Sequence, residues 1–415
     1  MLNLFQHLKI TQMKKIIFIL LSTFLPFYLY TRLSAEVKVA PYYTLQFTEG
    51  AFVPNIGEWN FSINLLSDIG VIVKPEGKHS FVGFYELKYT GPGLKRQEGE
   101  KFTDRTMDHL GVMRHTYNIT ENYFLKSQID YMKEYKRTGS NEVWGTGLYD
   151  FGRLGGLVSF GKKFSDELSA SVSGQYHFLN FPNYTDLLAE FQAGAENVES
   201  SAGKQNHSLY QTGFSVDYDI NRFSTDLIFQ RYTKQKVVMN TVQSDGTYYS
   251  SDLQKDIIIN LSASRKQELW RQISLLPTIS YKIKNSNQNY QHFETAGATV
   301  PVRYFADYYD YNQFVFSLPV AFVLGEKWEV SSTPEFDIKI YPKKPIRNSD
   351  GDFLDNKQKN NLFILSSGVT FKPNAVTRTT LFYVFQNQNS SMEFEKYLPY
   401  NYTANYFGMK FEYTY

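Results

Sequence analysis

The sequence contains no cysteine among its 415 residues. This absence excludes a disulfide framework, a cysteine-based zinc site and a lipidated N-terminal cysteine. Beyond the N-terminal region the chain also lacks an apolar run long enough for a membrane-spanning helix, so a helical membrane protein is not expected. The formal net charge is only +2, which gives no reason to expect a nucleic-acid partner.

The last residues of the chain alternate between two kinds of side chain. Apolar or aromatic side chains occupy every second position: Phe407, Met409, Phe411, Tyr413 and Tyr415. Glycine or a charged residue stands at Gly408, Lys410 and Glu412. A period of two is typical of a β-strand with one apolar and one polar face.

A strand that ends on an aromatic residue after such an alternation resembles the C-terminal β-signal of Gram-negative outer-membrane β-barrels. The resemblance implies a porin-like, all-β fold: a closed antiparallel transmembrane barrel in the bacterial outer membrane, inserted by the barrel assembly machinery. The composition fits, because lipid-facing residues at every second position combine 32 Tyr and 34 Phe with a mean hydropathy of −0.38. The alternative is the last strand of a soluble β-sandwich.

The N-terminus has the pattern of a secretory signal. Lys14 and Lys15 precede an apolar run over residues 16–30, and the small residues Ser34 and Ala35 follow. We expect cleavage after Ala35, with an uncleaved anchor helix as the alternative.

Residues 1–35 are thus assigned to the signal peptide and residues 36–415 to the barrel. Alternation predicts strands at residues 37–47, 60–74, 78–90, 108–118, 122–135, 147–160, 168–180, 210–218, 223–232, 256–264, 270–283, 309–323, 328–341, 362–371, 376–386 and 406–415. Their number is about sixteen, or about fourteen if the two segments before Lys78 do not pair. After Lys78 short turns and long loops alternate, as in barrels with short periplasmic turns and long extracellular loops.

Aromatic residues near the expected strand ends predict two interfacial belts: Trp270 and Trp328 after short turns, and Tyr89, Tyr232, Tyr281 and Tyr341 before long loops. Three prolines lie inside predicted strands, Pro277, Pro319 and Pro334, and each removes one ladder hydrogen bond.

The face opposite the apolar one should line the lumen. Its candidate residues carry both signs of charge: Lys126, Asp130, Arg153, Gln175, His177, Asp217, Asp226, Glu329, Glu335, Asp337, Lys339, Arg378, Lys410 and Glu412. In a diffusion porin, opposed charges of this kind create a transverse field across a water-filled constriction. Alternatively, the charges pair with one another and stabilise a plugged lumen.

No motif of an enzyme, cofactor site or metal site occurs in the sequence. His177, with Ser171 and Ser173 on the same face, suggests a nucleophilic site of the kind found in outer-membrane phospholipases, but polar side chains are the expected filling of a wet lumen. Residues 348–356 offer oxygen ligands around Gly351 and vaguely resemble a calcium loop. A surface turn is the favoured interpretation, because the EF-hand spacing is absent.

We therefore predict a channel for passive diffusion of small hydrophilic solutes or oligosaccharides, with no enzyme activity, cofactor or metal. A homo-oligomer in outer-membrane lipid is compatible with this function. The long segment at residues 181–206, with a short helix predicted at residues 186–193, should fold back and narrow the barrel. The alternatives are a surface-interaction barrel without significant conductance and an outer-membrane hydrolase.

Overall fold

The computed structural model describes residues 37–75, 77–93, 101–138, 142–184, 203–241, 248–292, 303–395 and 399–415. The predicted signal peptide and the helix expected at residues 186–193 lie outside these ranges. None of the described residues forms a helix long and apolar enough to cross a membrane.

The described chain folds into antiparallel β-strands joined by turns and loops. Their bounds are β1 (Lys38–Pro54), β2 (Asn60–Lys74), β3 (His79–Thr90), β4 (Arg105–Asn118), β5 (Tyr123–Arg137), β6 (Phe151–Lys163), β7 (Leu168–Asn180), β8 (His207–Tyr218), β9 (Asn221–Val238), β10 (Tyr249–Arg265), β11 (Gln267–Trp270), β12 (Ile273–Leu275), β13 (Thr278–Ser286), β14 (Tyr290–His292), β15 (Arg303–Phe305), β16 (Tyr311–Ser317), β17 (Val320–Leu324), β18 (Trp328–Arg347), β19 (Phe353–Phe371), β20 (Thr377–Ser390) and β21 (Tyr402–Thr414).

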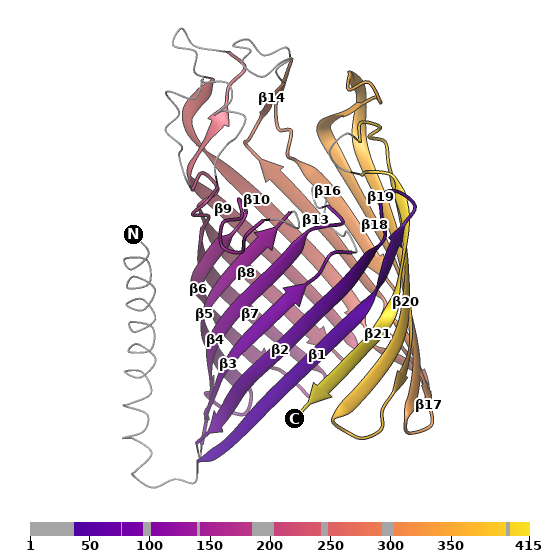
Figure 1. Cartoon of the computed structure of the whole chain (residues 1–415). Helices are drawn as coiled ribbons and strands as arrows, with labels where there is room; N and C mark the ends of the chain where they lie inside the picture. The colour runs from indigo at the N-terminus through magenta and orange to yellow at the C-terminus, as the bar shows by residue number, and fades with distance from the viewer. Residues whose placement is uncertain are drawn as a thin grey trace, which may run out of the picture.

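The sheet closes on itself because β1 pairs with β2 on one side and with β21 on the other (Figure 1). The result is a closed antiparallel barrel of 16 strands, so the first predicted segment belongs to the barrel and the alternative of fourteen strands is wrong. Closure leaves no open sheet edge, which hydrocarbon would penalise by several kcal/mol for each unpaired backbone group, as a rough estimate.

Two of the three prolines interrupt barrel strands. Pro277 separates β12 from β13, and Pro319 separates β16 from β17. Each lacks an N–H, so the ladder cannot continue through it, but its carbonyl still accepts: Leu276 N donates to Pro319 O at 2.9 Å. Pro334 lies within β18 without ending it.

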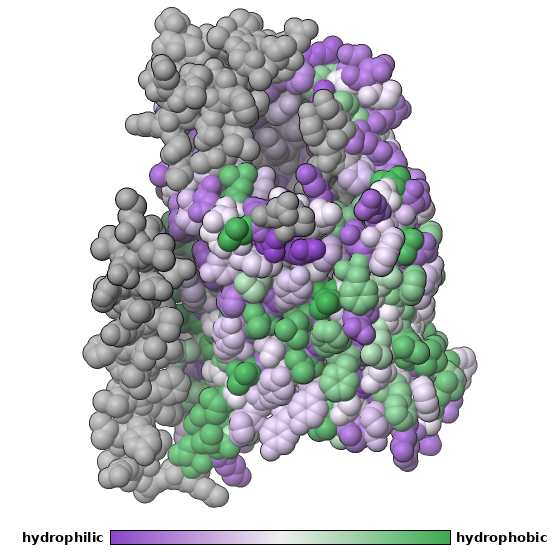
Figure 2. Space-filling model, viewed as in Figure 1, coloured by the Kyte–Doolittle hydropathy of each residue, from purple (hydrophilic) through white to green (hydrophobic). Residues whose placement is uncertain are grey.

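The two walls of the barrel differ in chemistry. The outer wall carries exposed apolar side chains such as Ile129, Leu154 and Val172, and Figure 2 shows apolar residues gathered over the lower part of the wall. The inner wall carries buried polar side chains such as Asp130 and Asp256. Because side chains alternate strictly, a shift of one residue would exchange the two walls, so the apolar face fixes the register.

The two rims of the barrel also differ. Short turns such as residues 119–122 and 271–272 lie at one rim, together with the start of β1 and the end of β21. We call this the short-turn rim and the opposite edge the long-loop rim.

Several predicted boundaries need correction. The strand β18 continues to Arg347 and β19 begins at Phe353, so most of the loop predicted at residues 342–360 is strand. Likewise β9 and β10 extend into the loop predicted at residues 234–251. These extensions rise beyond the apolar band, where no lipid contact imposes alternation.

Three of the predicted belt residues are misplaced. Trp270 ends β11 and precedes the turn at residues 271–272 instead of following it, because the strand resumes after a break at Lys266. Tyr232 and Tyr341 are only 8% and 5% exposed. Their places in the alternation put them on the inner wall, because Tyr232 pairs with the buried His207 and Tyr341 follows the inward Asp337 and Lys339 at every second position.

Candidate functional site in the barrel interior

The register puts all the predicted lumen residues on the inner wall. Strand pairing puts them on the same side as the buried Asp256. These residues are Lys126, Asp130, Arg153, Gln175, His177, Asp217, Asp226, Glu329, Glu335, Asp337, Lys339, Arg378, Lys410 and Glu412. The predicted assembly residues Phe407, Met409, Phe411 and Tyr413 lie on the opposite, outer side of β21. Tyr415 follows that strand and exchanges backbone hydrogen bonds with Tyr43.

One group of these residues forms a compact cluster around Asp130. The carboxylate is 3% exposed. Its Oδ1 accepts from Arg153 Nη2 at 3.0 Å and lies 2.9 Å from His177 Nε2. Gln128 Nε2 donates to the other oxygen at 3.3 Å. Desolvation of a carboxylate is costly unless it is paired, and here a guanidinium, an amide and an imidazole satisfy it.

The cluster does not assemble the nucleophilic site considered from the sequence. His177 Nδ1 lies 2.9 Å from Gln175 Nε2, and its Nε2 faces Asp130. Ser171 instead shares a hydrogen bond of 2.8 Å with Ser215. Within the described part of the chain neither ring nitrogen is bonded to a serine, whereas activation of a serine requires that contact.

Serines form a continuous row across five adjacent strands of the inner wall. The paired positions are Ser171, Ser215, Ser224, Ser262 and Ser280, on β7, β8, β9, β10 and β13. Ser224 and Ser262 share a hydrogen bond of 2.6 Å between their hydroxyls. We call these residues the serine row. Short side chains leave space in front of the wall and present hydroxyls that both donate and accept hydrogen bonds.

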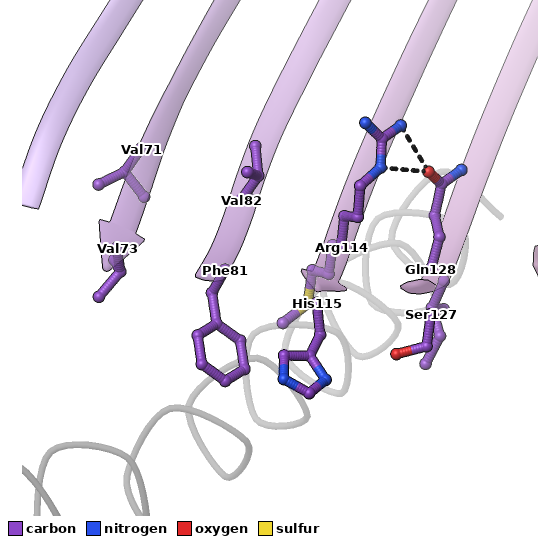
Figure 3. Close-up of a pocket in the computed structure, with 11 residues that line it drawn as sticks. Val71, Val73, Phe81, Val82, Arg114, His115, Ser127 and Gln128 are labelled. Carbon is purple, nitrogen blue, oxygen red and sulfur yellow. Dashed lines mark hydrogen bonds between the residues drawn. The ribbon is translucent and has the colours of Figure 1, made fainter. Parts of the chain in front are cut away.

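Two basic and two acidic residues of the inner wall lie on opposite sides of the barrel. Arg114 and Lys126 lie on β4 and β5, whereas Glu335 and Asp337 lie on β18, about halfway round the barrel. None of the four has an ion-pair partner among the described residues. Arg114 donates instead to the neutral Gln128 Oε1 at 3.0 and 2.8 Å, and Figure 3 shows this pair on neighbouring strands. These four charges oppose each other across the lumen, although each side also carries the other sign of charge, Asp130 on β5 and Lys339 on β18.

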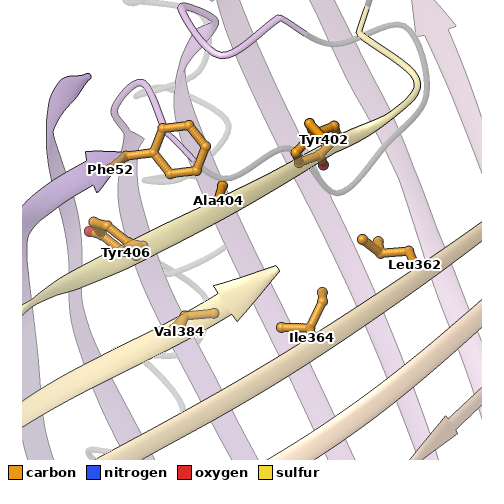
Figure 4. Close-up of a cluster of buried hydrophobic side chains, with 7 residues drawn as sticks. All are labelled: Phe52, Leu362, Ile364, Val384, Tyr402, Ala404 and Tyr406. Atoms are coloured by element: carbon orange, nitrogen blue, oxygen red, sulfur yellow. The ribbon is translucent and has the colours of Figure 1, made fainter. Parts of the chain in front are cut away.

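Near the long-loop rim, part of the inner wall is apolar. Phe52, Tyr402 and Tyr406 form a buried cluster with four further side chains from β19 to β21, Leu362, Ile364, Val384 and Ala404 (Figure 4). Phe102, from the loop between β3 and β4, packs on this cluster with its ring centroid 5.1 Å from that of Phe52. This loop therefore folds inward at its described end.

A second polar cluster lies on the inner wall around Asp256, which is not among the predicted lumen residues. Asp256 is completely buried, and Lys284 Nζ lies 2.9 Å from its Oδ2. Ser286 Oγ and Gln254 Nε2 donate to its Oδ1 at 2.6 and 3.1 Å. The sequence does contain a signal for this cluster. Asp256 begins the alternating stretch of residues 256–264 and lies on the polar face of that stretch.

Residues 348–352 form the turn between β18 and β19, as the favoured interpretation predicts. Gly351 N donates to Asn348 O at 3.0 Å, and Asn348 Oδ1 accepts from Asp352 N at 2.8 Å. The resemblance to a calcium loop is therefore explained by turn chemistry. Among the residues with described positions, no group of three or more acidic or histidine side chains is placed to hold a metal ion.

No family model matches the sequence, and no curated protein matches it at a significant level. Solved structures are similar in fold. OmpT, an outer membrane protein of Vibrio cholerae, aligns over 92% of this chain and 99% of its own, with 11% identity and a TM-score of 0.45. OccAB1 of Acinetobacter baumannii aligns over 90% and 96%, with 10% identity and a TM-score of 0.46. OccK8 (OprE) of Pseudomonas aeruginosa aligns over 90% and 98%, with 10% identity and a TM-score of 0.40.

The geometry identifies the kind of molecule independently of these likenesses. A closed barrel with an apolar outer wall and a polar inner wall is stable when lipid surrounds it and water or polar groups fill it. The chain is therefore an outer-membrane β-barrel in contact with membrane lipid, and no specific family is assigned.

Proposed function

We propose that this protein is a passive, porin-like channel for small hydrophilic solutes, including oligosaccharides. The observation that carries the proposal is that four inner-wall charges have no ion-pair partner among the described residues and face each other across the lumen, Arg114 and Lys126 on one side and Glu335 and Asp337 on the other. Opposed charges orient water and dipolar solutes across a pore and select by size and charge.

The serine row supports the same function. A solute that leaves bulk water loses hydrogen bonds, and hydroxyls on the wall replace them in part. A lumen filled only to stabilise the barrel would gain more from large, interlocking side chains than from a row of serines. The space in front of the row is therefore best explained by a path for solutes.

Single-channel recording in planar bilayers tests the proposal. The purified barrel should give stable conductance steps. Reversing both basic charges, with Arg114→Glu and Lys126→Glu, should shift the ratio of cation to anion permeability at least twofold towards cations. Lys327→Glu, in an exposed short turn, is the matched control and should leave the ratio unchanged. An absence of conductance steps would contradict the channel function.

A surface-interaction function is the second candidate. The β14–β15 hairpin and the turn after it carry several aromatic rings in contact, including Tyr290 and Tyr308 with centroids 4.6 Å apart. Such a platform is suited to contact a surface polysaccharide or another macromolecule. A barrel that folds but shows no conductance would favour this function.

Assembly is the remaining part of the proposal. The outward residues Phe407, Met409, Phe411, Tyr413 and the final Tyr415 are proposed to form the signal read by the barrel assembly machinery. Association into a homo-oligomer is compatible with the outer wall, which is apolar around its circumference.

A further inference from the structure

The inner wall near the long-loop rim contains a cavity of about 370 Å³. It lies where the extended parts of β9 and β10 meet β13 and β14. Its volume falls at the lower end of the range for small-molecule sites. The cavity is lined mainly by tyrosines and by side-chain amides, a different composition from the rest of the inner wall.

The amides of this cavity are held in fixed positions. Gln288 accepts from Val238 N at 3.0 Å and donates to Lys236 O at 3.0 Å, while its Nε2 also lies 3.2 Å from Gln254 Oε1. Gln254 is anchored in turn by Asp256, at 3.1 Å. Side chains that are fixed before a ligand arrives lose little conformational entropy on binding.

One of these amides has an unused acceptor. Gln291 is 4% exposed, and its Nε2 donates to Met239 O. Its Oε1 is buried and has no hydrogen-bond partner among the residues that the structure describes. A buried carbonyl oxygen without a partner is energetically unfavourable, and a ligand hydroxyl that donates to it would remove this penalty.

The charge of the cavity restricts the ligand. Lys284 is the one lining residue with a formal charge among those described, and it is neutralised by Asp256 at 2.9 Å. Burial raises the pKa of Tyr290, so its hydroxyl keeps its proton and can donate. The site therefore offers neutral donors, neutral acceptors and aromatic faces, with no uncompensated charge to bind an anion or a cation.

We propose that this cavity binds a neutral, polyhydroxylated molecule, in size a mono- or disaccharide. Sugar hydroxyls donate to and accept from amides, and the C–H faces of a sugar ring pack against tyrosine rings. The inference rests on the proposed function, because it identifies a binding site near the mouth of the channel and a class of solute.

Isothermal titration calorimetry on the folded barrel in detergent tests the inference with two matched probes. Maltose represents the neutral ligand, and maltobionate, its aldonic acid, adds a carboxylate. Maltose should bind at least tenfold more tightly than maltobionate. Gln291→Leu should weaken maltose binding about fivefold to tenfold, whereas Gln46→Leu, on the inner side of β1 across the barrel, should leave it unchanged. If Gln291→Leu does not fold, Gln235→Leu removes a second lining amide.

The outcomes separate the two proposals. A conducting barrel that binds no maltose, or binds maltobionate equally well, overturns this inference and leaves the channel function in place. Binding unaffected by both glutamine variants overturns the location of the site. A barrel that binds maltose through Gln291 but never conducts overturns the channel function alone.

Discussion

His177 and Asp130 are in direct contact although β6 runs between their strands: Nε2 of His177 lies 2.9 Å from Oδ1 of Asp130. Gly155 is the residue of β6 that lies between them: it pairs with Asp130 on β5 and with His177 on β7. A Cβ added to Gly155 would lie 2.0 Å from Tyr176 O and 2.4 Å from His177 Cδ2. The glycine therefore makes the bridge over β6 sterically feasible.

Replacing Gly155 by alanine should destabilise the barrel by about 1–3 kcal/mol, because backbone of the next strand must shift. Gly174→Ala on neighbouring β7 is the control, since an added Cβ there meets nothing within 4 Å. The temperature at which the folded, fast-migrating form is lost on gel electrophoresis measures the effect. Equal temperatures for the two variants would show that β6 adapts without cost.

The junction of β1 and β21 should be similarly sensitive. Gly50 and Gly408 are paired there, and a Cβ on Gly408 would lie 2.0 Å from Glu49 O. Gly408→Ala should reduce the yield of folded barrel several-fold, because this pairing closes the sheet. Gly83→Ala, which meets no atom within 4 Å, should fold like the wild type. Refolding yield into detergent micelles is the measurement.

The end of the last strand should control insertion. Tyr415→Asp, or deletion of β21, should lower the amount of protein in the outer membrane far more than a deletion in a long loop. The reason is that β21 both closes the barrel and carries the β-signal resemblance. Heat resistance of a barrel truncated before β21 would contradict the assigned closure.

Two segments are expected to narrow the pore. Deletion of residues 186–197, which lie outside the described ranges, should raise conductance and weaken size exclusion, because this segment is expected to fold back into the barrel. Folding should stay intact, since no described strand is touched. Phe102→Ala should have a smaller effect in the same direction, because its ring covers the Phe52 and Tyr402 cluster. Single-channel conductance measures both. Unchanged conductance in the deletion would place that loop outside the pore and favour the surface-interaction function.

Export should remove the N-terminal segment. The mature protein should begin near Glu36, because the signal pattern ends at Ala35. N-terminal sequencing of protein from the outer membrane measures this directly. Recovery of Met1 or Met13 as the first residue would contradict the assignment.

Alternation predicted strand positions well wherever lipid faces the wall. The bounds of β2 and β7 coincide with the predicted residues 60–74 and 168–180. In these strands one wall must be apolar, so the sequence carries a period of two that can be read directly. The same rule puts His177 on the polar face of β7, and the register pairs it with Gly155.

Prediction failed where that constraint ends. The upper parts of β18 and β19 stand beyond the apolar band, and residues such as Lys343 and Lys344 give no alternation, so the sequence predicts a loop there. The contact between His177 and Asp130 joins residues 47 positions apart. The contact depends on the register of three strands and on a glycine at position 155. A local sequence pattern predicts neither the register nor the need for this glycine.

The serine row crosses five strands at right angles to their direction. Strands in such barrels tilt by about 40° from the axis and lie about 4.8 Å apart, so the four steps of the row rise by roughly 12 Å along the axis. The hydroxyls thus lie along a line that is inclined to the barrel axis, instead of in a ring at one depth. In the proposed channel, a solute that follows this inclined line would exchange one hydrogen-bond partner at a time and would not lose its whole hydration shell at a single depth.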